Sequence, residues 1–236
     1  MKEKIAENQI SSHFIELRNR ILKTFLLFVI FSVVGIPFAN EIYSIVASPM
    51  TGLLPEGMIA TEIASPFVAP IKLVLFLALL ASMPWLFFQA WMYISPGLYK
   101  NEKIFTASLL ISTIVLFFGG AAFAFFIVCP LVLNFFNVMA PDGVQVMPDI
   151  NQYLSFIFKL VFGFGIAFEI PVATILLIRS GIVKKSSLAK ARPYLILFFF
   201  ILGMVLTPPD VISQLFLALP MWVLFELGLL LSKDKK

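Results

Sequence analysis

Residues 153–178 read YLSFIFKLVFGFGIAFEIPVATILLI, and only Lys159 and Glu169 interrupt this apolar run with a charge. As an α-helix the run would be about 39 Å long at 1.5 Å per residue, which is enough to cross a hydrocarbon layer of about 30 Å. Stretches of this length with so few charges are typical of transmembrane helices. The sequence therefore places this segment in a membrane.

Five more apolar segments extend this interpretation to nearly the whole chain. Of the 236 residues, 61% are hydrophobic and only 13% are charged, which excludes an ordinary soluble enzyme, a disordered tail and a coiled coil. The expected fold is an all-α integral membrane protein with six transmembrane helices in a single polytopic domain, 1–236. An amphipathic segment, 1–20, precedes the helices at 21–231, and a tail follows at 232–236. The other five predicted spans are 21–38, 67–94, 104–128, 194–206 and 211–231.

The basic residues lie on one side of this predicted arrangement. Fifteen of the 17 Lys and Arg residues fall in the N-terminal segment and the entrance of the first span, in the loops after the second and fourth spans, and in the C-terminal tail. The loops at 39–66, 129–152 and 207–210 carry no Lys or Arg. By the positive-inside rule both termini are cytoplasmic. The remaining two bases, Lys72 and Lys159, lie inside predicted spans, each near the end that faces away from the cytoplasm. We expect them to reach the interface there by snorkelling.

Glu169 is the most deeply placed charged residue. It lies sixteen residues after Tyr153, or about 24 Å along a helix, where a carboxyl group is costly unless it has a partner. Two interpretations stay open: a structural hydrogen bond within the chain, for which Pro171 would free the carbonyl of Ala167, or a functional site. Kinks are predicted at the prolines in or near the ends of the spans, Pro84, Pro130, Pro171 and Pro220.

Two acidic residues stand among the bases on the predicted cytoplasmic side. Glu16 precedes Arg20 by one helical turn, so the simplest interpretation is an exposed ion pair worth about 0.3–0.5 kcal/mol. Glu102 stands at the start of the third predicted span, where the helix dipole favours a negative charge. Alternatively, the two acids form a site for a basic ligand.

The sequence also limits the chemistry. His13 and Cys129 are the only histidine and the only cysteine, which excludes a His/Cys metal cluster and an internal disulfide, and Cys129 is expected to fill an apolar core. There is no P-loop for nucleotide binding, so the energy for any transport would come from a partner or from the gradient across the membrane. We expect no cofactor, no metal, no catalytic residue and no nucleic-acid partner.

A series of short motifs, taken together and in order, resembles the TatC family of the twin-arginine protein translocase. The resemblance extends roughly from Ile10 to Leu231, and Cys129 departs from it by replacing a larger apolar residue. The motifs are HFIELRNR (13–20), ASPF (64–67), PGLY (96–99) followed by Glu102, YLSF (153–156), FEIP (168–171), RPY (192–194) and LTPPD (206–210) followed by Ser213 and Gln214.

This resemblance implies a receptor that binds paired-arginine signal peptides at the cytoplasmic face and helps to export folded proteins with the proton-motive force. The implied fold is a curved, cupped arrangement of six helices in which the fifth and sixth are short. The implied partners are single-span TatA- and TatB-type subunits, signal peptides of folded cargo, membrane lipid and further copies of the chain. The implied location is the bacterial cytoplasmic (inner) membrane.

The resemblance also implies roles for particular residues. Signal-peptide binding falls to Glu16 and Glu102, supported by Arg18, Leu98 and Tyr99. An intramembrane polar site for a partner helix comprises Glu169, Met204, Thr207 and Gln214. Phe67 and Asp210 match motif positions on the outer face.

The residues themselves leave other classes to consider. A proton- or ion-coupled secondary transporter would use Glu169 as its intramembrane site, but it usually shows an internal repeat, and spans one to three are not convincingly repeated in spans four to six. An intramembrane enzyme is disfavoured because His13 and Asp210 fall on opposite sides of the membrane and cannot share a catalytic triad. We therefore expect a protein that is not an enzyme.

The charge asymmetry predicts the outcome of a topology experiment. A reporter enzyme that is active only outside the cytoplasm should be active when fused after Met58 or Val144. The same reporter should be silent when fused after Asn101 or Lys185, because the basic loops are held in the cytoplasm. The inverse pattern of activity would contradict the predicted orientation.

Overall fold

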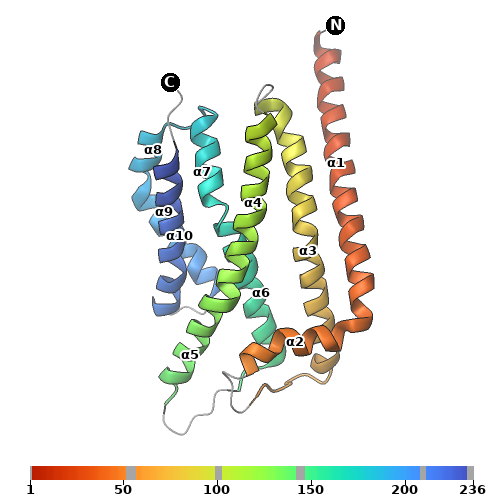
Figure 1. The fold of residues 1–236 in the computed structure, drawn as a ribbon, viewed down its shortest axis with the longest axis vertical. Helices are drawn as coiled ribbons and strands as arrows, with labels where there is room; N and C mark the ends of the chain where they lie inside the picture. Colours follow the sequence, from red (N-terminus) through yellow and green to blue (C-terminus); the bar gives the residue numbers. More distant parts are fainter. Residues whose placement is uncertain (1, 52–56, 99–102, 142–146, 208–210, 233–236) are drawn as a thin grey trace. The chain divides into compact units, whose positions relative to one another are not determined.

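The computed structural model describes residues 2–51, 57–98, 103–141, 147–207 and 211–232, and the regular elements in these ranges are helices (Figure 1). Five stretches within them are long and apolar enough to cross a membrane, and a sixth apolar helix, α9 (Arg192–Leu206), has only 15 residues. The prediction of an all-helical membrane protein with a short fifth helix is confirmed, whereas the sixth, with 21 residues, is among the stretches long enough to cross. The five longer stretches are Phe14–Ala47, Ser65–Tyr93, Ala107–Met139, Ile150–Arg179 and Val211–Leu231.

The contacts divide the chain into two compact units. The first combines Met1–Ser44 with Pro70–Leu110, and the second combines Ile45–Ala69 with Ile111–Lys236. The helices α2 (Ala39–Thr51), α3 (Ser65–Leu98) and α4 (Lys103–Phe123) each pass from one unit to the other.

In the first unit, α1 (Lys2–Gly35) packs against α3. A β-carbon at Gly35 would lie 2.7 Å from Cγ1 of Val74, so the missing side chain of this glycine allows the two helices to approach closely. The helix α1 begins far ahead of the predicted span at residue 21, because polar residues continue the helix beyond its apolar part. It ends at η1 (Ile36–Phe38), a short 3-10 turn with a proline in its first turn.

In the second unit a π-helical turn joins two helices. This turn, η2 (Ala124–Val128), lies between α4 and α5 (Cys129–Met139). Pro130 stands in the first turn of α5, where its missing N–H disturbs the helix least. The third helical run therefore continues to Met139, well past its predicted end at residue 128. Cys129 is fully buried, as expected of a packing residue.

The fourth span is interrupted at Pro171, as predicted. The helix α6 (Ile150–Ala167) ends one turn before α7 (Ile170–Arg179), and Pro171 lies in the first turn of α7. By contrast, α3 continues through Pro84 and α10 (Val211–Leu231) continues through Pro220.

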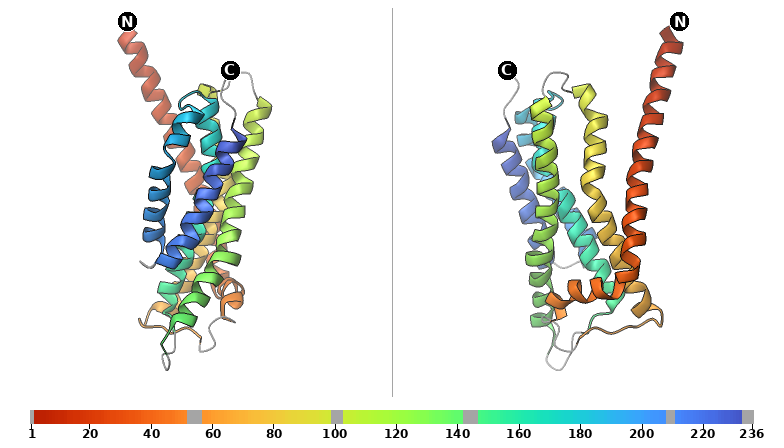
Figure 2. Two further views of the ribbon diagram at one scale, coloured as in Figure 1. Left: turned by 90° about the vertical axis from the view of Figure 1, so that its left-hand side faces the viewer. Right: turned by 45° about the vertical axis from the view of Figure 1, so that its right-hand side comes forward.

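The last helices form a hairpin that packs on α7. The helices α9 and α10 lie side by side (Figure 2). Arg192 ties the start of α9 to Glu226 of α10 through two hydrogen bonds of 2.6 and 2.9 Å. At Gly228 a β-carbon would come within 2.8 Å of the Pro171 Cα, so only glycine permits this contact between α10 and α7. The helix α8 (Lys185–Lys190) precedes the hairpin, and the buried core below it includes Phe199, Met221 and Phe225.

Asp149 connects the loop after α2 to the start of α6. Its Oδ2 accepts hydrogen bonds from the backbone N–H and the hydroxyl of Thr61, at 2.9 and 2.6 Å. Its Oδ1 caps α6 by accepting from the backbone N–H groups of Asn151 and Gln152 at 2.9 and 3.1 Å. The Thr61 bonds, and to a smaller extent the cap bonds, favour the ionised form and lower the pKa of Asp149 to about 2.

This network predicts a stability change at acidic pH. Because the folded-state pKa of Asp149 lies below its ordinary value of 3.8, the stabilisation is complete above about pH 4 and is lost as the pH falls through about 2. We expect Asp149→Asn to lower the melting temperature of the purified protein by a few degrees at pH 7. The difference from the wild type should shrink between pH 4 and pH 2. A difference that does not change with pH would contradict the assignment.

Candidate functional site

A pocket of about 550 Å³ opens between α1 and α3 in the first unit, and Glu16 lies in its wall. Arg20 reaches Glu16 from one turn further along α1 and donates two hydrogen bonds to Oε1, from Nε at 3.0 Å and from Nη2 at 2.6 Å. The expected ion pair is therefore confirmed. The other lining residues are Ile15, Asn19, Lys23, Phe88, Gln89 and Met92.

The pair is more than a surface contact because Arg20 also binds α3. Its Nη1 donates to Oε1 of Gln89 at 2.8 Å, across 69 positions of sequence. The Arg20 side chain is 18% exposed, whereas that of Glu16 is 47% exposed. One guanidinium group thus joins an accessible carboxylate to a buried amide. This arrangement can hold a guanidinium group through several directed hydrogen bonds.

The other predicted signal-binding residues are not all brought to this pocket. Arg18 is exposed and does not line it, because two residues along a helix turn a side chain by about 200° from Glu16. Leu98 is the last residue of α3, but its side chain lies outside the described part of the chain. Tyr99 and Glu102 fall outside the described residues altogether.

Glu169 lies at the junction between α6 and α7 in the second unit. The hydroxyl of Thr113 on α4 lies close to its carboxyl group. Nevertheless, Glu169 Oε1 and Thr113 Oγ1 are both buried and complete no hydrogen bond with the part of the chain that the structure describes. The backbone of Glu169 continues the turn between the helices, with its N–H donating to Ile166 O at 3.0 Å. This places an incompletely paired carboxyl group beside a helix break.

The remaining predicted positions lie around the hairpin and at the start of α3. Thr207 is buried and donates its hydroxyl proton to the Gly203 carbonyl at 2.9 Å. Met204 is exposed, and Gln214 is half-buried with its backbone against Gly203. Phe67 is exposed at the start of α3. Asp210 falls outside the described residues.

Metal binding has no support within the described ranges. No three His, Cys, Asp or Glu side chains come together there in a way that would hold an ion.

Comparison with known proteins identifies the family. The family model "Sec-independent protein translocase protein (TatC)" matches residues 12–220. The chain belongs to the TatC family. The Sec-independent protein translocase protein TatC of Azotobacter chroococcum mcd 1 is 49% identical over 92% of this chain and 86% of its own length. The TatC of Escherichia coli (strain K12) is 46% identical over 94% of this chain and 87% of its own length.

A solved structure agrees with this assignment. A crystal structure described as the twin arginine translocase receptor TatC matches with a TM-score of 0.82 and 34% identity, over 92% of this chain and 96% of that one. A second crystal structure of the same receptor, in DDM, matches with a TM-score of 0.84. The resemblance noted from the sequence is confirmed.

Membership of the TatC family settles the broad class of activity. The chain is a multi-pass membrane component of a bacterial protein translocase of the Tat type, and it is not an enzyme. The secondary transporter is not favoured, since the matching proteins are translocase subunits.

Sequence reasoning missed two polar residues beside these sites. Gln89 and Thr113 each stand within a predicted apolar span, 67–94 and 104–128. A lone amide or hydroxyl group in a transmembrane segment needs a partner, and this cost was the available signal. Arg20, which binds Gln89, and Glu169, which lies close to Thr113, are far away in sequence, so only the tertiary structure shows which groups meet.

The geometry at Glu169 predicts the effect of removing the nearby hydroxyl group. Thr113→Val preserves the side-chain shape, and Thr113 Oγ1 makes no hydrogen bond with the described residues. We therefore expect the free energy of unfolding of the purified subunit to change by less than about 0.5 kcal/mol. Chemical denaturation in detergent would measure it. A loss of about 1.5 kcal/mol or more would mean that Thr113 and Glu169 form a structural pair.

Proposed function

We propose that this chain is the receptor subunit of its translocase and that Glu16, together with Glu102, binds the paired arginines of signal peptides at the cytoplasmic face. The observation that carries the proposal is the two-nitrogen contact that Glu16 Oε1 accepts from the guanidinium group of Arg20. A carboxylate already in this geometry, at the wall of an open pocket, suits an incoming arginine. The solved relative described as a twin arginine translocase receptor supports the same role.

The pocket favours arginine over lysine for physical reasons. A guanidinium group donates several hydrogen bonds in one plane, whereas an ammonium group is a point charge without that fork. Phe88 and Met92 supply an apolar wall for the methylene groups of the ligand. Lys23 lines the same pocket and repels an isolated positive charge that lacks the matching hydrogen bonds.

In this proposal Arg20 occupies the carboxylate until the signal arrives. An arriving arginine replaces one guanidinium by another at Glu16, so the carboxylate is never left unpaired. Gln89 holds Arg20 on α3 while this exchange takes place. Arg18, Leu98 and Tyr99 support the bound peptide nearby, and Glu102 takes the second arginine.

The proposal extends to assembly and orientation. Both termini face the cytoplasm of the bacterial inner membrane, and the proton-motive force drives export of the folded cargo. Single-span TatA- and TatB-type subunits pack against Glu169, Met204, Thr207 and Gln214, and several copies of the chain associate in the complex. The incompletely paired carboxyl group of Glu169 supports this role, because a polar group on a partner helix would satisfy it. Phe67 and Asp210 act on the opposite face.

Binding of a labelled twin-arginine signal peptide to the reconstituted protein tests the recognition site. We expect Glu16→Gln and Glu102→Gln each to weaken binding about tenfold, since a hydrogen bond to a charged group is worth about 1.5–3 kcal/mol. Arg20→Met should strengthen binding, because it removes the internal competitor for Glu16. Replacing the paired arginines of the signal by lysines should weaken it.

Glu41→Gln serves as the matched control, since Glu41 is an exposed acid on α2 that does not line the pocket. Its peptide affinity should equal that of the wild type. If Glu16→Gln and Glu102→Gln both bind the signal normally while the protein remains folded, Glu16 has only a structural role and the proposed recognition site is wrong.

A further inference from the structure

A polar stripe runs along the first turns of α6 in the second unit. Asn151, Ser155 and Lys159 recur at intervals of four residues and therefore share one face of the helix. They occupy the first ten residues of the 30-residue apolar stretch Ile150–Arg179. Hydrocarbon would penalise the charge of Lys159 strongly, so we expect this side of α6 to face water or lipid headgroups down to the level of Lys159.

The stripe ends where α9 begins to cover α6. The next residue on this face is Gly163, and a β-carbon there would lie 2.8 Å from Cδ1 of Leu206. Leu206 is the last residue of α9. Gly163 lies about 20 Å along the axis of α6 from Ile150, at 1.5 Å per residue. The short helix α9 therefore leaves the N-terminal part of α6 without its cover.

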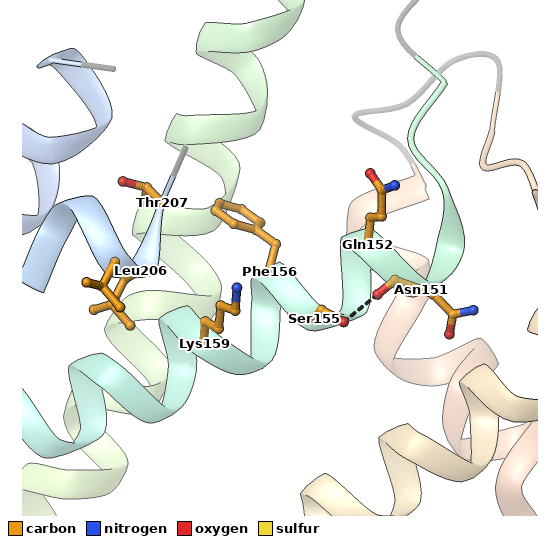
Figure 3. Close-up of a pocket in the computed structure, with 8 residues that line it drawn as sticks. Asn151, Gln152, Ser155, Phe156, Lys159, Leu206 and Thr207 are labelled. Atoms are coloured by element: carbon orange, nitrogen blue, oxygen red, sulfur yellow. Dashed lines mark hydrogen bonds between the residues drawn. The ribbon is translucent and has the colours of Figure 1, made fainter. Parts of the chain in front are cut away.

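A pocket of about 450 Å³ lies between the N-terminal part of α6 and the end of α9 (Figure 3). Lys159 extends into it and ends between Phe156 and Leu206. The apolar residues that line the pocket are Phe156, Val205 and Leu206, and the polar ones are Asn151, Gln152, Ser155, Lys159 and Thr207.

Most polar groups in the pocket already have partners within the chain. The Asn151 side-chain amide donates to Oγ of Ser65 at 2.6 Å, and the Ser155 hydroxyl donates to the Asn151 backbone carbonyl at 2.7 Å. The Thr207 hydroxyl donates to the Gly203 carbonyl. By contrast, the Lys159 ammonium group and the Gln152 side-chain amide make no hydrogen bond with any residue that the structure describes. A cation and an amide donor are thus left facing the same space beside an apolar wall.

We propose that this pocket binds the phosphate group of an anionic phospholipid, which descends to the level of Lys159 because α9 is too short to keep hydrocarbon there. Lys159 and Gln152 hold the phosphate oxygens. Phe156, Val205 and Leu206 contact the glycerol and the first part of the acyl chains. A zwitterionic lipid binds less well, because Lys159 repels its ammonium group. The inference is independent of signal recognition and of which membrane face the pocket occupies.

Photocross-linking in nanodiscs tests the site. The full chain is reconstituted in phosphatidylcholine with a small fraction of phosphatidylglycerol that carries a photoreactive group near its headgroup, and cross-links are mapped by peptide. We expect Lys159→Gln to lower the yield on the α6 and α9 peptides about fivefold, the effect of about one lysine near a charged surface. Lys159→Arg should retain the yield, and Lys72→Gln, a change at another lysine within a span, should leave it unchanged.

Competition identifies the source of the phosphate. Unlabelled phosphatidylglycerol should reduce the cross-linking, whereas extra phosphatidylcholine and soluble glycerol phosphate should not. Equal yields from the wild type and Lys159→Gln would overturn the proposal, as would equal competition by phosphatidylcholine. Competition by glycerol phosphate would replace the lipid with a soluble anion and overturn the lipid assignment.

A depth measurement tests the premise separately. A nitroxide label at Ser155→Cys should be reached by a water-soluble relaxation agent, and a label at Ile166→Cys, an exposed apolar position further along α6, should be reached by oxygen dissolved in the lipid. If both labels lie in hydrocarbon, the headgroups do not descend to Lys159 and the proposal fails.

Discussion

A polar group that enters hydrocarbon must find its partner within the protein, because no water is there to replace a missing hydrogen bond. This constraint accounts for several features of the chain that otherwise have little in common. Ser32 and Ser82 return their hydroxyl protons to carbonyls of their own helices, at 2.8 Å in each case. Arg20 binds both a carboxylate and an amide. At Glu169 the constraint is incompletely met, because one carboxyl oxygen is buried without a hydrogen bond to the described residues.

Helix length adds a second constraint, which acts through the bilayer. The 15 residues of α9 span about 22 Å, less than the hydrocarbon thickness of about 30 Å. A helix this short must be shielded by neighbours or met by a locally thinner membrane. The neighbouring helix α6 is suited to both. Gly163 packs against the end of α9, and between Gly163 and the start of α6 a polar stripe takes the place of apolar residues. Length mismatch thus explains why a lysine is found so far inside an apolar stretch.

The two candidate regions use charge in different ways. At Glu16 the carboxylate is accessible and its internal partner is an arginine of the same helix, so the proposed ligand binding would exchange one guanidinium group for another. At Glu169 the carboxyl group is incompletely paired and lies beside a helix break, so the proposed partner would supply a missing hydrogen bond. An exchange favours selectivity between similar cations, since the alternative partner must be displaced. Supplying a missing hydrogen bond favours association within the membrane, where an unsatisfied polar group gains most from a partner.

By itself the sequence determined the class of the protein. It also predicted five helical runs that are long enough to cross a membrane and the short α9, because hydrophobic runs and their lengths are local properties. It also identified the Glu16–Arg20 pair and the break at Pro171, since both depend on spacing along one helix. The ordered motifs were enough to suggest the family. The extension of α1 beyond its predicted limit escaped it, because polar residues continue that helix without an apolar signal. The third run also continues past its predicted end, because the helix accommodates Pro130 in the first turn of α5. Only the tertiary structure showed that Gln89 accepts a hydrogen bond from Arg20 and that Thr113 lies close to Glu169. The same holds for the end of α9, where Leu206 packs against Gly163. These contacts join residues far apart in the chain, and which side chains meet depends on the rotation and tilt of each helix, which packing decides.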